Sequence, residues 1–191
     1  MAADKEKSKA LYYYYSILEK ENKKEEANSY LLKAVKKCNV KAINKYVLQF
    51  LNAENQTDFN KHSKECVFYL KKASDKGNFD SMYHYGMMLL EGKGVHRDKE
   101  KAAKYLRIAA LNGNVDAMFQ YGSMLLLDDG ITIDEEEGIK FIKMAADNGN
   151  REGMFHYAFN CHFGINAEID LKEAAKYYKM AANEGIVEAA Q

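Results

Sequence analysis

The stretch YLKKASDKGNFDSMYHYGMMLLEGKGVHRDKEKAAK, residues 69–104, decides the fold because the chain repeats its pattern twice more. Residues 105–140 read YLRIAALNGNVDAMFQYGSMLLLDDGITIDEEEGIK, and residues 141–176 read FIKMAADNGNREGMFHYAFNCHFGINAEIDLKEAAK. Residues 177–191, YYKMAANEGIVEAAQ, begin a fourth copy. A fixed period of 36 residues indicates that one supersecondary unit is stacked several times, as in a solenoid.

Each copy is predicted to form two antiparallel helices. A glycine follows a run of helix-forming residues once per copy, where a helix end needs a left-handed residue; these are Gly77, Gly113, Gly149 and Gly185. The helix that follows this glycine, for example 115–128, is the first helix of the pair. It is expected to end near Gly92–Gly94 in one copy and near Asp128–Gly130 in the next copy. An aspartate then stands where the second helix begins and accepts hydrogen bonds from free backbone amides; these are Asp98, Asp134 and Asp170.

Apolar and small residues fall on one face of each predicted helix, which marks that face as buried. In the first helix of the pair they are Met82, Tyr85, Gly86 and Leu89, then Met118, Tyr121, Gly122 and Leu125, then Met154, Tyr157, Ala158 and Cys161. In the second helix they are Ala102, Leu106 and Ala109, then Gly138, Ile142 and Ala145, then Ala174, Tyr178 and Ala181. The small residue of each first helix is expected to let the paired helices approach closely; these residues are Gly86, Gly122 and Ala158.

The stretch YGMMLLEGKGVHRDKEKAAKYLRIAALNG, residues 85–113, resembles the Sel-1-like repeat family, a relative of the tetratricopeptide repeat. The resemblance extends over about residues 69–191, and the third copy departs from it at Ala158 and Asn166, where the family has glycine. It implies an all-α, right-handed α-solenoid of stacked antiparallel helix pairs. The expected repeats are 77–112, 113–148 and 149–184, with two divergent repeats in 1–76 and a truncated one in 185–191.

The divergent N-terminal part contains four consecutive tyrosines in LYYYYSILEK, residues 11–20. Aligning Tyr30–Ala34 with Tyr69–Ala73, a spacing of 39, matches Tyr14 with Tyr46 and Tyr85. Tyr14 is therefore predicted to be the core tyrosine, with Leu11 and Leu18 on its face. Tyr13 is predicted to be exposed, and Tyr15 takes the position of the small Gly86.

Composition and charge argue against two classes of protein, those that bind nucleic acid and those that insert into a membrane. The net charge is zero, but residues 1–76 carry 16 Lys and Arg against 10 Asp and Glu, whereas residues 77–191 carry 12 against 18. This asymmetry is too weak to predict nucleic-acid binding. The polar start MAADKEKSK contains no apolar signal region, and no apolar run approaches the length of about 20 residues that spans a bilayer. We expect a cytoplasmic protein without membrane insertion.

The sequence contains none of the short motifs that carry catalysis or cofactor binding. The glycines of GKGVHRD lie in a loop that recurs as DDGITID, so they are explained by backbone geometry. The acidic run Asp134–Glu137 starts a helix, where the helix dipole favours negative charge. Cys38, Cys66 and Cys161 lack metal-ligand spacing. We expect no catalytic residue, cofactor or metal.

The resemblance implies a scaffold or adaptor that binds a protein or peptide on the concave face, which the first helices line. The residues predicted to face that groove are Tyr83, His84, Met87, Phe119, Gln120, Ser123, Phe155, His156 and Phe159. The alternative is that these side chains pack between repeats or face water. Two other functions stay open: a regulatory arm of a larger enzyme or receptor, and a hydrolase-like activity in the groove. The unfinished fourth repeat also predicts a longer parent protein or self-association through that end.

Overall fold

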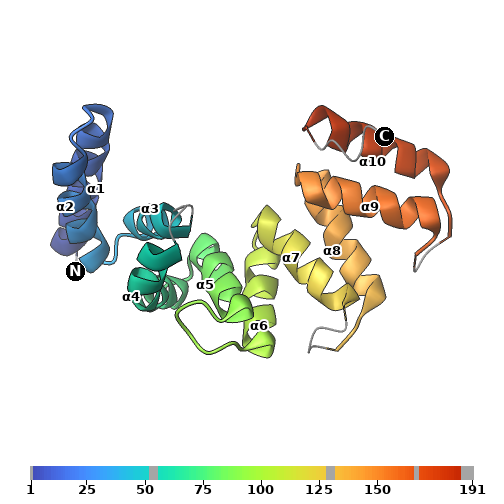
Figure 1. Cartoon of the computed structure of the whole chain (residues 1–191), viewed down its shortest axis with the longest axis horizontal. Coiled ribbons are helices and arrows are strands. Elements are labelled where there is room, and N and C mark those ends of the chain that lie inside the picture. Colours follow the sequence, from blue (N-terminus) through green and yellow to red (C-terminus); the bar gives the residue numbers. More distant parts are fainter. Residues whose placement is uncertain (1, 52–55, 128–131, 166–167, 186–191) are drawn as a thin grey trace. The chain divides into compact units, whose positions relative to one another are not determined.

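The computed structural model describes residues 2–51, 56–127, 132–165 and 168–185, and this part contains ten helices and no strand (Figure 1). The chain forms two compact units, Met1–Asp98 and Lys99–Gln191. The first contains α1 (Ala2–Lys20), α2 (Lys24–Lys36), α3 (Val40–Leu51), α4 (Gln56–Ser74) and α5 (Phe79–Glu91). The second contains α6 (Lys99–Leu111), α7 (Val115–Leu126), α8 (Glu135–Asp147), α9 (Arg151–Phe163) and α10 (Leu171–Asn183). The predicted all-α fold of helix pairs with a period of about 36 residues is confirmed.

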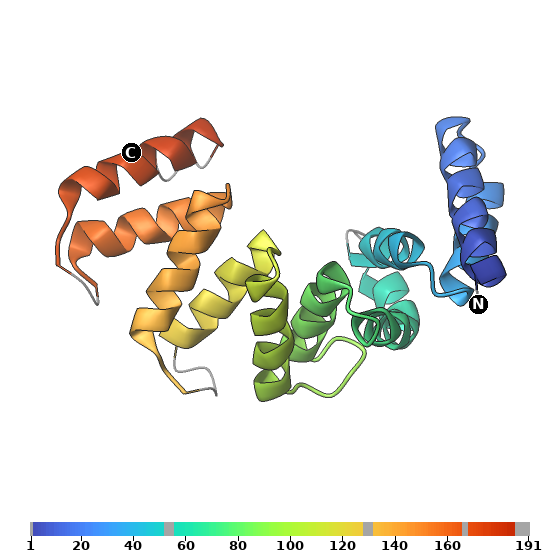
Figure 2. The same ribbon diagram turned by 180° about the vertical axis from the view of Figure 1, so that it is seen from behind.

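Within each unit, helices that follow one another in sequence pack against one another (Figures 1 and 2). In the second unit this holds for α6 with α7, α7 with α8, α8 with α9 and α9 with α10. The turn at 128–130, Asn166 and residues 186–191, for which the sequence analysis made predictions, lie outside the described residues.

The predicted glycine helix ends and the aspartate caps of α8 and α10 are confirmed. The four recurring glycines have left-handed φ angles between +82° and +92°. Asp134 and Asp170 cap α8 and α10, because their carboxylates accept hydrogen bonds from the amides of Glu137 and Glu173 at 2.9 Å. Asp98 directly precedes α6.

Sequence reasoning missed the caps of the first helices, which are asparagines directly after the left-handed residue. Asn78, Asn114 and Asn150 each accept a hydrogen bond from the backbone amide three residues later, at 2.7–2.8 Å. In the N-terminal part the left-handed residue is Cys38, with φ of +54°, and Asn39 then bonds the amide of Ala42. A glycine–asparagine pair between two apolar stretches is the sequence signal for this turn.

In the three clear repeats, residues 77–184, the predicted core faces are buried with two exceptions, Tyr157 and Tyr178, which are only half-buried. On α10 the buried tyrosine is Tyr177, at 1% exposure, one residue before the predicted Tyr178. Positions i+3 and i+4 of a helix flank the same face, so either can occupy the core. Tyr177 is selected because its hydroxyl reaches α8, where it donates a hydrogen bond to Asp147 and accepts one from Lys143 Nζ.

The prediction that Tyr14 is the core tyrosine of α1 is wrong. Tyr14 is 42% exposed, whereas Tyr15 is 2% exposed, the same fraction as Tyr85. Leu18 is buried as predicted, and Leu11 is only half-buried. Only three residues connect α1 to α2, against seven between α5 and α6. Tyr15 and Leu18 are three residues apart and therefore share the buried face of α1.

Candidate binding surface

Four of the nine residues predicted to face the groove form one aromatic cluster in the second unit. The ring of Phe119 on α7 lies 5.3 Å from that of His156 on α9, measured between centroids. Phe155 lies 5.8 Å from His156 and 6.4 Å from Phe159. We call these four residues the α7–α9 surface.

The side chains of the α7–α9 surface are not equally available to a partner. Phe159 is 39% exposed and His156 is also exposed, whereas Phe119 and Phe155 are half-buried. Phe155 packs against the core cluster of α8, α9 and α10, and its ring lies 5.7 Å from that of Tyr178. Part of the Phe155 side chain is therefore already used in the packing of the second unit.

The aromatic row on α9 continues beyond the predicted residues. Phe163 is 55% exposed, and its ring lies 4.5 Å from Phe159. His162 stacks on Phe163 at 4.4 Å. Phe155, Phe159 and Phe163 are spaced by four residues, which places them along one side of a helix. This spacing is the sequence signal that would have extended the predicted surface to Phe163.

The other predicted residues are half-buried, and two lie on α7. Gln120 and Ser123 follow Phe119 by one and four positions. Tyr83, His84 and Met87 lie on α5 in the first unit, where the rings of Tyr83 and His84 are 5.0 Å apart.

His156 is the titratable group of the α7–α9 surface. Partial burial between the rings of Phe119 and Phe155 lowers the pKa of its imidazole below the usual value, and the Glu152 carboxylate partly opposes this effect. The imidazole is therefore neutral at pH 7 and offers one hydrogen-bond donor and one acceptor.

Cys66 and Cys161 do not have the environment of a nucleophile. Cys66 is fully buried, and desolvation with the nearby Glu65 carboxylate raises the pKa of its thiol to about 12. Burial also raises the pKa of Cys161. Both side chains act as small apolar residues of the core, as predicted.

The described residues offer neither a metal site nor a helix able to span a membrane. No group of three or more His, Cys, Asp and Glu side chains in this part of the chain is arranged to hold a metal ion. Likewise, no helix among the described residues combines the length and the apolar character needed to cross a bilayer.

Comparison with known proteins identifies the repeat. The family model described as the Sel1 repeat matches residues 63–78, 79–114, 115–150 and 151–186. No curated protein sequence matches the chain.

Solved structures share the fold. A Sel1 repeat protein from Oxalobacter formigenes matches with a TM-score of 0.80 and 24% identity, over 93% of this chain and 71% of that one. The protein c5321 of uropathogenic Escherichia coli, a protective antigen displaying an SLR fold, matches with a TM-score of 0.73 and 19% identity, over 85% of this chain. The chain spans 34% of the length of c5321. A Klebsiella pneumoniae protein described as a sel1 repeat protein matches with a TM-score of 0.60 and 15% identity, over 96% and 89% of the two chains.

Proposed function

Because the chain belongs to the Sel1 repeat family, whose members are typically protein-interaction scaffolds, we propose that it binds a segment of a partner protein through the α7–α9 surface. The observation that carries this proposal is the exposed row of Phe159 and Phe163 on a helix whose opposite side is already buried in the core.

Among the described residues, Phe159 and Phe163 take little part in the packing of the second unit, because their side chains are 39% and 55% exposed. The core side of α9 is formed by Met154 and Ala158, at 5% and 0% exposure. Phenylalanine rings left in water at Phe159 and Phe163 cost hydration free energy that contact with a partner recovers. Large aromatic residues are also among those enriched at the centre of protein interfaces. A partner that covers both rings is therefore favoured over solvent.

The polar residues that α7 and α9 carry beside the aromatic positions suit a peptide backbone. His156, neutral at pH 7, offers a donor and an acceptor, and Gln120 on α7 offers both through its carboxamide. A bound segment loses the water bonded to its own amides and carbonyls, so such side chains offset part of that cost. Ser123, one helical turn after Phe119, supplies a further hydroxyl.

The α5 residues Tyr83, His84 and Met87 offer the same kinds of side chain in the first unit. An aromatic ring, an imidazole and an adaptable thioether are half-buried there, with part of each surface left for a partner. We propose that this group is a separate contact surface of the first unit for a protein segment.

The test starts from a pull-down with the whole chain, followed by mass spectrometry and measurement of the dissociation constant of the partner. The double variant Phe159→Ala, Phe163→Ala should weaken binding at least about tenfold, as loss of buried aromatic anchors does. The matched control is Ile108→Ala, Leu111→Ala, which removes two side chains of α6 that are 44% and 56% exposed. The proposal fails if the control weakens binding as much as the α9 variant, or if the α9 variant binds normally.

A further inference from the structure

The helix α1 has an exposed apolar face in addition to the face that lies in the core. It packs against α2, and its Tyr15 and Leu18 are buried (Figures 1 and 2). On the outer side of α1, Tyr13 and Ile17 are 60% and 53% exposed, and Tyr14 beside them is also exposed. Single exposed apolar residues are normal at a protein surface, but three that adjoin on one helix form a patch that a partner can cover.

Four exposed residues spaced by four form a row along this outer face. Lys9, Tyr13, Ile17 and Glu21 follow one another by about one helical turn, so they lie along one side of the helix. Glu21 comes directly after α1, but its backbone amide still donates a hydrogen bond to the carbonyl of Ile17 at 3.1 Å, which keeps it in the helical register. The row, which we call the α1 row, therefore has a cation at one end, two apolar side chains in the middle and an anion at the other end.

The aromatic rings beside the α1 row are held in place by one another. The ring of Tyr12 lies 6.3 Å from that of Tyr13, and Tyr14 meets the ring of Tyr30 on α2 edge to face at 4.6 Å. Lys33 Nζ in turn lies 4.2 Å from the centre of the Tyr30 ring. Side chains that are already ordered lose little conformational freedom when a partner binds, so this face is preorganised for contact.

The α1 row is complementary to itself when a second copy of the helix runs antiparallel. Lys9 then lies opposite Glu21 of the second copy, and Tyr13 lies opposite its Ile17. Two-fold symmetry forms each of these contacts twice. A parallel arrangement would place lysine against lysine and glutamate against glutamate, and such like charges repel each other. The order of charges along the row therefore selects an antiparallel second copy as its partner.

The ion pairs within the chain do not prevent these contacts. Lys9 pairs with Glu6 at 3.4 Å, and Glu21 pairs with Lys23 at 2.7 Å. All four side chains are about half exposed or more, and exposed ion pairs contribute little to stability. Glu6 at one end of the face and the exposed Lys20 at the other end also have opposite signs, so they add to the antiparallel preference.

We propose that the chain forms a weak symmetric dimer in which the α1 row packs antiparallel against the α1 row of a second copy. One helix face per copy buries less than the roughly 1,200–2,000 Å² of a standard interface, so we expect a dissociation constant on the order of 100 μM. The proposal involves residues of the first unit only, so it stands whether or not the α7–α9 surface binds a partner.

Sedimentation equilibrium of the whole chain, from about 5 μM to about 1 mM, brackets the expected dissociation constant. The average mass should rise from the 21.8 kDa of one chain towards twice that value. The variants Lys9→Glu and Glu21→Lys should each weaken the dimer about tenfold or more, because each places two pairs of like charges in the interface. The double variant Lys9→Glu, Glu21→Lys restores opposite charges and should recover the association of the parent chain.

The matched control is Lys64→Glu, which makes the same change of charge at an exposed lysine of α4 and should leave the dimer unchanged. Melting temperatures measured on dilute protein should agree in all variants, because the altered side chains are exposed. A parent chain that stays monomeric at the highest concentration overturns the proposal. A dimer that survives both single variants would be made by another surface, and a double variant that fails to associate would refute the antiparallel pairing.

Discussion

Gly122 of α7 and Gly138 of α8 lie so close together that a methyl group on Gly122 would be 2.8 Å from the carbonyl oxygen of Gly138. The same methyl group would lie 3.0 Å from the backbone nitrogen of Ile142, and one on Gly138 would lie 2.7 Å from a methyl carbon of Leu126. The paired helices of this repeat therefore approach through two glycines, which confirms the predicted role of the small residue at position 122.

Gly122→Ala should destabilise the protein by about 1–3 kcal/mol, even though alanine is the better helix former by about 0.5–1 kcal/mol. The reason is that the close neighbours of the new methyl group include backbone atoms, which cannot rotate away as a side chain does. Urea unfolding followed by circular dichroism measures the loss. Equal or greater stability of Gly122→Ala would contradict the close approach.

Gly113 provides a control of a different kind, because it has a φ of +91° and a methyl group added to it would meet no atom within 4 Å. Gly113→Ala should cost about 1 kcal/mol from backbone strain alone. Gly113→Asn should cost less, since asparagine adopts the left-handed conformation more readily. At Gly122, by contrast, the asparagine variant should lose more stability than the alanine variant, because the asparagine side chain is larger.

Tyr121 and Tyr13 test the assignment of core and surface. Tyr121 is 6% exposed, and its ring meets that of Phe141 edge to face at 5.0 Å, whereas Tyr13 is 60% exposed. Tyr121→Ala should cost roughly 3–5 kcal/mol, as truncation of a large core aromatic does. Tyr13→Ala should stay within about 0.5 kcal/mol of the parent chain. Denaturation midpoints that fall equally in both variants would contradict this assignment.

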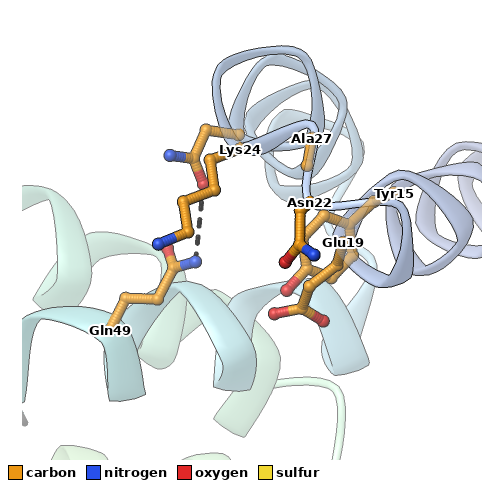
Figure 3. Close-up of a pocket in the computed structure, with 7 residues that line it drawn as sticks. Tyr15, Glu19, Asn22, Lys24, Ala27 and Gln49 are labelled. Atoms are coloured by element: carbon orange, nitrogen blue, oxygen red, sulfur yellow. Dashed lines mark hydrogen bonds between the residues drawn. The ribbon is translucent and has the colours of Figure 1, made fainter.

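The repeated part of the chain was predictable because three copies of one pattern specify the same core positions. In the divergent repeats of residues 1–76 the alignment depended on the assumed length of the connections between helices, and it placed the core tyrosine at Tyr14 instead of the buried Tyr15. The pocket that Glu19, Asn22 and Gln49 line between α1, α2 and α3 had no sequence signal, because these residues belong to no common motif (Figure 3). Only the packing of three helices brings such side chains together.

The low pKa of His156 predicts a pH dependence of stability. Its pKa in the folded protein is lower than its usual value of 6.5, so the unfolded chain binds the proton more tightly. His156 therefore lowers the free energy of unfolding as the pH falls from above 6.5 to below the folded pKa, and this effect is absent above 6.5. His156→Gln should lose less stability than the parent chain between about pH 7.5 and 5.5, as measured by urea unfolding. The same loss in both chains would show that His156 titrates normally.

Asn160 of α9 lies 36 residues after Met124 and 72 after Met88, and all three are buried, at 8%, 3% and 1% exposure. Its amide nitrogen has no hydrogen-bond partner among the described residues. Asn160→Met restores the apolar residue of the other two copies and should raise the free energy of unfolding by about 1 kcal/mol, because an unbonded buried amide is removed. The reciprocal variant Met124→Asn should lower the free energy of unfolding by more than Asn160→Met raises it, since it places an unbonded amide in a buried position that packs a methionine side chain. A loss of stability in Asn160→Met would show that the amide is bonded in solution and holds α9 through that bond.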